Sequence, residues 1–377
     1  MAVSGADKEA DAATATVPVD VLRGFIAEIF TAAGCAADEG WRISHHLLSA
    51  NLTGHDSHGV IRTPRYVQWL QEGKVIAGQK IIVLHETPTH AIVDGQYGFG
   101  QTVAPQAVDL GIAKAKQNGL SVIGLRFAGH IGRIGDWGER AAEAGLVSVH
   151  FVNVAGGELV APFGGVDRRF STNPVCIAAP TLEGPLVLDF ATSLVAEGKV
   201  LVASNGGKPV PPGSLIEPDG TLSSDPRTLY GPIEGTHVRD SAQGLGALRA
   251  FGEHKGSGLA FMCEILAGCL TAGGTSGPIP GGKRSRIANG MLSIYLQPGS
   301  FGAEHFQEAA REYANYVKAS RPATPGGEVL VPGEPEARIR VQRLRDGVPL
   351  QATTWAAICA TADSLGVVPP AVAKPNV

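Results

Sequence analysis

The chain has 377 residues, of which 18% are charged and 44% are aliphatic, aromatic or cysteine, with a formal net charge of −4 at pH 7. This length and composition allow a large buried core in two domains, or in one domain with a smaller appendage. The slightly negative charge, without aromatic residues interleaved among Lys or Arg, argues against nucleic acid as a partner. No apolar run is long enough to span a bilayer, so we expect no membrane association.

The first sixteen residues are small and acidic and lack the basic start and apolar centre of a signal peptide. We expect residues 1–16 to form a disordered tail. The five cysteines are odd in number and include no CxxC pair, which argues against a disulfide framework and against a zinc site. We therefore expect a reducing, cytoplasmic environment in which each cysteine packs as a small apolar residue.

Helical periodicity dominates the N-terminal region. Apolar residues recur at helical spacing after Asp20, a good N-cap, and stop at Gly34. A second helix is expected to carry Trp41, His45 and Leu48 on one face, and we interpret His45 as packed on that helix rather than as a ligand.

The stretch from Gly54 to Tyr66, GHDSHGVIRTPRY, gathers an unusual set of reactive side chains. Thr63 can cap a third helix with Pro64 at its first position, which places His58 and Arg62 on the loop that enters the helix. A titratable ring beside a guanidinium suits the turnover of a small 2-oxo or 2-hydroxy acid. A solvated polar loop is the alternative interpretation.

From residue 80 onward, β-branched runs alternate with helical patterns, which predicts a layered α/β region. The expected strands are 81–86, 90–95, 121–127, 146–154, 186–189, 291–298 and a short one at the start of 329–344. The expected helices are 99–119, 136–145, one that opens at Thr192 or Ser193 and runs to 204, a long apolar helix within 251–274 after a glycine-rich entry, 304–320, the rest of 329–344, and 353–366. Asp219-Gly220 predicts a hairpin turn in a surface excursion. No repeat or low-complexity linker is present, so we expect interwoven domains.

Three places could bind a ligand or an anion. His130 follows a strand, where open α/β sheets bind ligands, although it could merely satisfy backbone groups. Asp189 closes a strand before a helix start at Thr192 or Ser193, which suits a phosphate or could be an ordinary capped turn. Lys255 stands at the glycine-rich entry to a long helix and makes a second candidate anion site.

Two candidate nucleotide-binding motifs do not match the pattern that each requires. The segment from Gly277 to Lys283, GPIPGGK, has the spacing of a phosphate-binding loop, but Arg284 replaces the required Ser or Thr and no strand precedes it. The dinucleotide fingerprint GxGxxG is absent, since Gly129, Gly132 and Gly135 are spaced by threes. A Rossmann fold is therefore not expected.

Six ordered blocks carry a resemblance: GHDSHGVIRTPRY, GLRFAGHIGRIG, STNPVCIAAP, LDFATSLVAEGK, HKGSGLAFMCEILAG and VLVPGE. From about Val19 to about Gly366 the chain resembles the malate/L-lactate dehydrogenase family that lacks a Rossmann fold. The resemblance implies a homodimeric NAD(P)-dependent oxidoreductase of mixed α/β (α+β) fold. It implies a helical N-terminal part, 17–78, that carries substrate residues and is joined by C-terminal helices of 303–377, with an α/β cofactor-binding domain at 79–302.

The resemblance also implies the roles of individual residues. It places Ser57, His58, Arg62 and Tyr66 in the substrate site, with His130 facing nicotinamide and substrate. The residues implied to hold the dinucleotide are Asp189, Phe190, Ala191, Thr192, Lys255, Gly256, Pro332, Gly333 and Glu334. In one departure, Ser257 stands where the family usually has Tyr, which leaves open what replaces the contact of that ring.

Reduction of a carbonyl group requires a proton donor for its oxygen. We expect His58 to donate the proton and His130 to polarise the same oxygen, although either histidine could serve. Reduction of a cyclic imine such as piperideine carboxylate is an alternative, because that substrate shares the carboxylate that Arg62 would bind. A metal-dependent hydrolase using HDSH and His130 is a remote alternative, because no thiolate or carboxylate cluster completes a metal site.

The choice between NAD and NADP depends on how the adenosine ribose is recognised. A carboxylate favours the free 2′-hydroxyl of NAD, whereas a 2′-phosphate needs a cation. In the segment AGGELVAPFGG the only acid is Glu158, and the nearest downstream cations are Arg168 and Arg169. We expect NAD with NADP tolerated, although Glu158 could simply face water.

Overall fold

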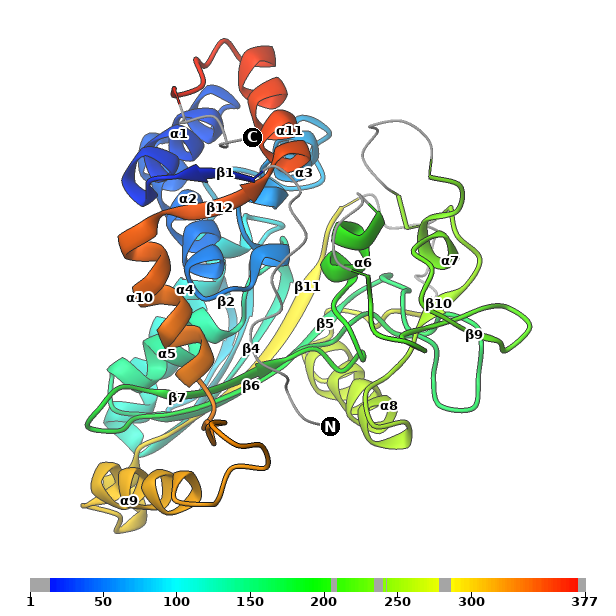
Figure 1. The fold of residues 1–377 in the computed structure, drawn as a ribbon. Helices are drawn as coiled ribbons and strands as arrows, with labels where there is room; N and C mark the ends of the chain where they lie inside the picture. Colours follow the sequence, from blue (N-terminus) through cyan, green and yellow to red (C-terminus); the bar gives the residue numbers. More distant parts are fainter. Residues whose placement is uncertain (1–13, 205–208, 234–239, 242, 278–285, 372–377) are drawn as a thin grey trace.

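A seven-stranded mixed sheet forms the centre of the computed structural model, which describes residues 14–204, 209–233, 240–241, 243–277 and 286–371 (Figure 1). The strand order is β2-β3-β4-β11-β5-β6-β7. Its strands are β2 (Ile82–Glu86), β3 (His90–Asp94), β4 (Leu120–Ala128), β5 (Val147–Val154), β6 (Val175–Ala179), β7 (Leu186–Phe190) and β11 (Asn289–Leu296). Only β3 and β4 pair in parallel, and β11 lies antiparallel between β4 and β5.

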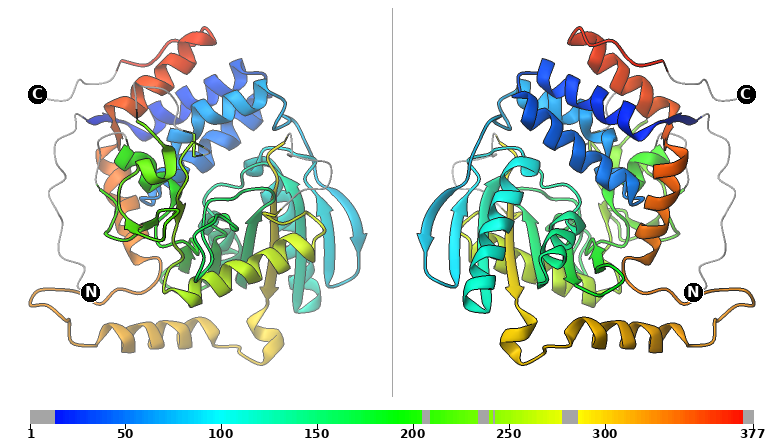
Figure 2. Two further views of the ribbon diagram at one scale, coloured as in Figure 1. Left: turned by 90° about the vertical axis from the view of Figure 1, so that its right-hand side faces the viewer. Right: turned by 90° about the vertical axis from the view of Figure 1, so that its left-hand side faces the viewer.

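Helices cover both faces of this sheet. The helices α4 (Gly100–Asn118) and α5 (Gly135–Glu143) pack on one face, and α8 (His254–Cys263) with the π-helical turn η3 (Glu264–Cys269) packs on the other (Figure 2). Buried side chains of α4, α5 and the sheet form one continuous hydrophobic core. The mixed α/β fold predicted from the sequence is confirmed.

The N-terminal helices form a second core above the sheet. They are α1 (Val19–Ala32), α2 (Ala37–Leu52) and α3 (Thr63–Gln71), and the short turns η1 (Asp56–His58) and η2 (Val60–Arg62) precede α3. Val348, Leu350 and Ile358 from the C-terminal region are buried in the same core. This region supplies α10 (Glu334–Asp346), β12 (Val348–Gln351) and α11 (Ala352–Ser364).

Several sequence expectations about these ends were wrong. Residues 14–16 belong to β1 (Thr14–Val17), which pairs antiparallel with β12, so they are not part of a disordered tail; residues 1–13 lie outside the described part. The short strand expected before α10 is absent among the described residues 328–333. The C-terminal helices of 303–377 were expected to join the N-terminal helices. Helix α9 (Phe306–Lys318), with the turn η4 (Pro298–Phe301) before it, instead lies at the far end of the sheet from the N-terminal helices (Figures 1 and 2).

A small lobe follows β7. It contains α6 (Glu197–Ser204), α7 (Arg227–Tyr230) and a three-stranded sheet of β8 (Leu215–Ile216), β9 (Leu222–Ser223) and β10 (Ala247–Leu248) around its own core. The hairpin predicted at Asp219-Gly220 is confirmed, since β8 pairs antiparallel with β9 and Gly220 has φ 89°.

Some predictions about exposure were also wrong. Trp41 and His45 face outward on α2, because Ile43, Leu47 and Leu48 form its buried face. All five cysteines are free, but Cys269 is exposed. Among the described helices, none is long and apolar enough to cross a bilayer. Most of the GPIPGGK segment lies outside the described residues.

Candidate active site

The GHDSH loop is held from two directions. Asn51, buried at the end of α2, accepts a hydrogen bond from the Val60 backbone N–H at 2.8 Å and donates to Asp56 at 2.6 Å. From α10, Arg343 donates to both carboxylate oxygens of Asp56, at 2.6 and 3.0 Å, and also to the Asn51 carbonyl. A bidentate pair of this kind fixes direction as well as distance. The loop backbone that carries Ser57 and His58 is therefore anchored at Asp56.

Helix α3 starts one residue earlier than expected. Thr63 is its first residue rather than its cap, and the Thr63 hydroxyl makes no capping hydrogen bond. Pro64 occupies the first turn, where its missing N–H costs nothing. Tyr66 and Trp69 share a face as predicted, with ring centroids 5.6 Å apart, so Tyr66 points inward towards the loop that carries His130.

Two histidines stack at the centre of the site. The rings of His58 and His130 lie 5.5 Å apart, centroid to centroid, with 9° between their planes. Ser57 Oγ lies 3.2 Å from His58 Nδ1, and Tyr66 Oη lies 2.5 Å from His130 Nδ1. Residues 72 positions apart in the chain therefore meet in one cluster, as the resemblance implied.

Both histidines are neutral in this environment. Burial, reinforced by the facing His130 and by Arg62, holds the pKa of His58 well below its usual value. Burial and Arg62 lower the pKa of His130 to about 3. Burial raises the pKa of Tyr66 to about 12, so its hydroxyl is protonated at neutral pH. Because Gln101 donates to the Tyr66 oxygen, the Tyr66 proton is directed to His130 Nδ1, which leaves the His130 proton on Nε2.

Arg62 is fixed by two contacts. Its Nε donates to the Ser57 carbonyl at 2.6 Å, and its Nη2 donates to Glu197 of α6 at 3.2 Å. Burial opposes the charged form, but Glu197, Tyr66 and Tyr230 together outweigh it and raise the pKa of Arg62 above its usual value. The guanidinium is therefore a permanent cation beside the two neutral imidazoles.

Residues implied to hold the dinucleotide come together along β7. The Val187 N–H donates to the Pro332 carbonyl at 3.2 Å, and Asp189 accepts from the Gly135 N–H at 2.7 Å. The Phe190 ring lies 5.5 Å from the Phe251 ring, near the start of α8. Strand β7 is an edge strand of the sheet, and at Val187 the residues around Pro332 already cover part of its outer side.

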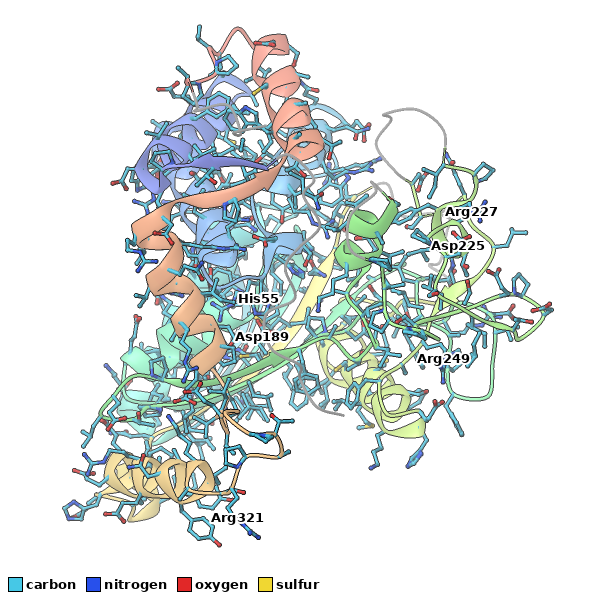
Figure 3. The ribbon with its side chains drawn as sticks, viewed as in Figure 1. His55, Asp189, Asp225, Arg227, Arg249 and Arg321 are labelled. Carbon is cyan, nitrogen blue, oxygen red and sulfur yellow. The ribbon has the colours of Figure 1, made fainter. Side chains whose placement is uncertain are left out.

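Asp189 joins a buried charge cluster. Figure 3 shows Asp189 close to His55, and Arg133 lies 3.8 Å from the carboxylate. Burial raises the pKa of Asp189, against the opposing effect of His55 and Arg133. The Nε and Nη2 atoms of Arg133 are buried and have no hydrogen-bond partner among the described residues. Because Nε is directed at Asp189, Nη2 is the donor that lacks an acceptor among the described residues.

Other residues on the implied cofactor list do not match their expected local structure. Helix α6 begins at Glu197 rather than at Thr192 or Ser193, and the Thr192 N–H and hydroxyl both donate to the Thr172 carbonyl. Thr192 therefore does not offer a free helix-start N–H to a phosphate. Lys255 is exposed in the first turn of α8, as expected.

The neighbours of Lys255 have packing roles. A side chain at Gly256 would clash with the Phe251 backbone. Ser257, the departure from the family pattern, accepts a hydrogen bond from the Phe163 N–H at 2.9 Å.

Pro332, Gly333 and Glu334 line a cavity of about 530 Å³ between α9, α10 and the loop before β7. Gly333 has φ 94°, a conformation that favours glycine, and it directs the chain into α10. Glu334 accepts from the Val331 N–H and pairs with Lys318 of α9. The cavity wall also includes Glu336, which lies 3.6 Å from His55 and so links this region to the GHDSH loop.

The residues considered for the choice of cofactor are engaged elsewhere. Arg168 donates to four backbone carbonyls of the small lobe, and Arg169 pairs with Asp167. Glu158 is exposed and close enough to Arg168 to affect its pKa. Arg168 is therefore a structural residue of the small lobe and has few donors left for a 2′-phosphate.

Sequence reasoning missed three functional neighbours: Arg133, Glu197 and Arg343. Arg133 and Glu197 both lie inside recognised motifs, GHIGRIG and LVAEGK, but neither motif shows which loop they contact. Arg343 lies 287 residues from Asp56 in the chain, so no local pattern connects them.

The chain is similar to known proteins over most of its length. The profile of the malate/L-lactate dehydrogenase family matches residues 17–359. The chain is 40% identical to hydroxycarboxylate dehydrogenase B of Escherichia coli (strain K12) over 348 residues, which are 92% of this chain and 93% of that relative. It is 33% identical to a Delta(1)-pyrroline-2-carboxylate/Delta(1)-piperideine-2-carboxylate reductase of Pseudomonas putida over 338 residues, 88% of this chain and 92% of that one.

The fold is shared with a solved relative. The structure of malate dehydrogenase from Pyrococcus horikoshii OT3 matches with a TM-score of 0.83 at 29% identity, covering 96% of this chain and 98% of that chain. The chain therefore belongs to the malate/L-lactate dehydrogenase family and is an oxidoreductase of the hydroxyacid dehydrogenase type.

Proposed function

We propose that this enzyme interconverts a small 2-oxo acid and the corresponding 2-hydroxy acid, with NAD or NADP as the hydride carrier. The observation that carries the proposal is the stacked pair of histidines, His58 and His130, in one cluster with the buried guanidinium of Arg62. A cation binds the carboxylate that all such substrates share, and imidazoles interact with the neighbouring carbonyl oxygen.

The residues along β7 fit a dinucleotide. The buried Nη2 of Arg133, which has no hydrogen-bond partner among the described residues, suits an anionic group, and the cavity beside Gly333 and Glu334 has room for a large ligand. We propose that Asp189, Phe190, Ala191, Lys255 and Gly256 border the same groove, with Thr192 supporting it through the backbone. When bound, the nicotinamide supplies the hydride.

The chain's own residues then bind, orient and protonate. Arg62 binds the substrate carboxylate and turns the carbonyl group towards the two imidazoles. His130, with its proton on Nε2, donates a hydrogen bond to the carbonyl oxygen and polarises it. His58 delivers the proton, with Ser57 orienting its ring. A bound carboxylate raises the pKa of a nearby imidazole, which opposes the lowering by burial, His130 and Arg62 and favours a protonated His58 in the complex.

The test is a pair of substitutions, His58→Ala and His130→Ala, with NAD(P)H oxidation followed on 2-oxo acids. General acid catalysis contributes about 10²- to 10⁴-fold, so we expect His58→Ala to lower kcat by an amount in that range. Near-normal turnover in His58→Ala together with complete loss in His130→Ala would assign the proton to His130 instead. Absence of turnover by the wild-type enzyme on every 2-oxo acid would refute the proposal.

A cyclic imine is the second candidate substrate, favoured by the similarity to the Pseudomonas putida reductase. Parallel assays with 2-oxoglutarate, phenylpyruvate and piperideine-2-carboxylate discriminate between the two classes. A metal-dependent hydrolase is the remote alternative. Elemental analysis of the purified enzyme, and activity that survives a chelator, decide against it.

For the remaining properties, we propose NAD with NADP tolerated, a cytoplasmic enzyme, and a homodimer. The preference for NAD is tested by the relative turnover of NADH and NADPH in wild type and in Glu158→Ala. A preference for NADPH that the substitution leaves unchanged would show that Glu158 does not determine the choice of cofactor. Exposed apolar side chains on α8, on η3 and just after it, including Phe261, Ile265 and Leu270, support a subunit contact. We also propose residues 79–302 as the main cofactor-binding part, with 17–78 contributing the substrate residues.

A further inference from the structure

The small lobe reaches the substrate loop through one carboxylate. Glu197, the first residue of α6, accepts a hydrogen bond from Arg62 Nη2 at 3.2 Å with one oxygen. Its other oxygen accepts from the Tyr230 hydroxyl at 2.5 Å. The side chains of Arg62 and Glu197 are each 20% exposed, so the pair is largely shielded from water. Glu197 lies 135 residues from Arg62 in the chain, so this is a contact between two separate parts of the fold.

The pattern of contacts leaves one edge of the guanidinium open. Arginine has five N–H donors in one plane: Nε and Nη2 share one edge, and Nη1 and Nη2 share the other. The Ser57 carbonyl occupies Nε and Glu197 occupies Nη2. Among the described residues, Nη1 has no hydrogen-bond partner. Two fixed donors set the plane of the group, so the edge that includes Nη1 remains for a bidentate carboxylate.

Glu197 is itself fixed by the core of the small lobe. Tyr230, which holds its carboxylate, is 2% exposed and packs among the apolar residues of that core. The next residue, Gly198, lies so close to Ser57 that an added Cβ would clash with the Ser57 Cβ. Helix α6 therefore contacts the substrate loop at two adjacent points, one polar and one steric.

We propose that Glu197, anchored by Tyr230, is a positioning residue that orients Arg62 for the substrate carboxylate, so that the small lobe controls substrate binding. This inference rests on the proposed function, in which Arg62 binds that carboxylate. Two opposing effects must be weighed. Glu197 reduces the net positive charge near the site, which weakens long-range attraction, but it removes the rotational freedom of a long side chain. The attraction between Arg62 and the substrate carboxylate acts at short range once the two are in contact, so we expect the fixed orientation of the guanidinium to outweigh the loss of net charge.

The experiment measures KM for the 2-oxo acid, KM for NADH and kcat in Glu197→Ala, Glu197→Gln and Tyr230→Phe. A charge-assisted hydrogen bond corresponds to a factor of about 10 to 100 in affinity, so we expect Glu197→Ala to raise KM for the 2-oxo acid on the order of tenfold or more. KM for NADH should stay unchanged. Glu197→Gln should lie within about threefold of wild type, because an amide oxygen still accepts from Arg62. Tyr230→Phe should give an intermediate rise.

Two controls separate positioning from general stability. Glu217→Ala removes another small-lobe acid that accepts a hydroxyl hydrogen bond, from Thr228, and should leave KM unchanged. In a double-mutant cycle, Glu197→Ala should have no further effect on KM in an Arg62→Ala background, since it acts only through Arg62. Urea midpoints of all variants show whether each one folds.

The outcomes are distinct. Additive effects of Glu197→Ala and Arg62→Ala, a fall in KM in Glu197→Ala, or equal losses in Glu197→Gln and Glu197→Ala would each overturn the positioning role. If the wild-type enzyme reduces no 2-oxo acid, the proposed function fails instead. An active wild type with an unaltered KM in Glu197→Ala refutes this inference alone.

Discussion

The clamp between Arg343 and Asp56 gives a sharp test of how the substrate loop is held. In Arg343→Met, the loop loses two hydrogen bonds to the Asp56 carboxylate and one to the Asn51 carbonyl. Charge-assisted hydrogen bonds contribute about 1.5–3 kcal/mol in protected sites. The Arg343 side chain is only 15% exposed but that of Asp56 is 45% exposed, so solvent screening reduces the expected cost to about 1–2 kcal/mol.

If this free energy holds the loop in its productive conformation, kcat/KM should fall by a factor of about 5 to 30. The assay is reduction of a 2-oxo acid at saturating NAD(P)H. Arg345→Met is the matched control, because Arg345 lies on the same helix, is 75% exposed and pairs only with the adjacent Asp346 among the described residues. Equal activities of the two variants would refute the reasoning. The reasoning would also be refuted if Arg343→Met lowered kcat/KM by the same factor in an Asp56→Asn background as in wild type.

Two further predictions concern stability and packing. Burial lowers the pKa of the His150 imidazole to about 3 in the folded protein, whereas its ordinary value of 6.5 applies in the unfolded chain. As the pH falls, the unfolded chain therefore binds a proton at His150 before the folded protein does. This difference in proton binding should lower the free energy of unfolding by about 2 kcal/mol at pH 5. Urea unfolding of wild type and His150→Asn should therefore show that the free energy of unfolding of wild type, relative to that of the variant, falls by this amount from pH 7 to pH 5. A difference between the two proteins that is the same at both pH values would contradict this prediction. Gly198→Ala should displace Ser57 and lower activity at least about tenfold, since the clash is with fixed atoms. Gly258→Ala, with no atom near the added Cβ, should keep full activity.

Local signals in the sequence predicted most elements of the sheet region. Helix α4 and strands β3, β4 and β11 follow apolar periodicity and glycine boundaries, which depend only on neighbours in the chain. The order of the strands in the sheet depends on residues that are far apart in the chain. Strand β11 lies between β4 and β5 because the chain returns to the sheet after a long excursion. The pairing of β1 with β12 was missed for the same reason, since each strand has four residues and gains its stability from the other.

In the site, too, features with a local signal were predicted, and features that depend on distant residues were not. The resemblance named His58, His130 and Tyr66 together, because each lies in a motif with a strong local pattern, and the structure brings these three side chains into one cluster. It did not indicate how these side chains are oriented, because the groups that orient them come from other elements. Gln101 on α4 directs the Tyr66 proton, Glu197 on α6 fixes Arg62, and α10 holds the GHDSH loop.

Both ends of α10 contact residues that we assign to binding. Its first residue, Glu334, borders the cavity proposed for the dinucleotide, whereas Arg343 in its last turn anchors Asp56 beside Ser57 and His58. Glu336, in the first turn of α10, pairs with His55, and that contact lowers the pKa of the Glu336 carboxyl. Any shift of α10 when the cavity fills must therefore move or strain the substrate loop, because a helix transmits displacement along its axis. The cofactor and the substrate should consequently bind with coupled affinities, and by thermodynamic linkage the coupling factor must be the same in either order of addition.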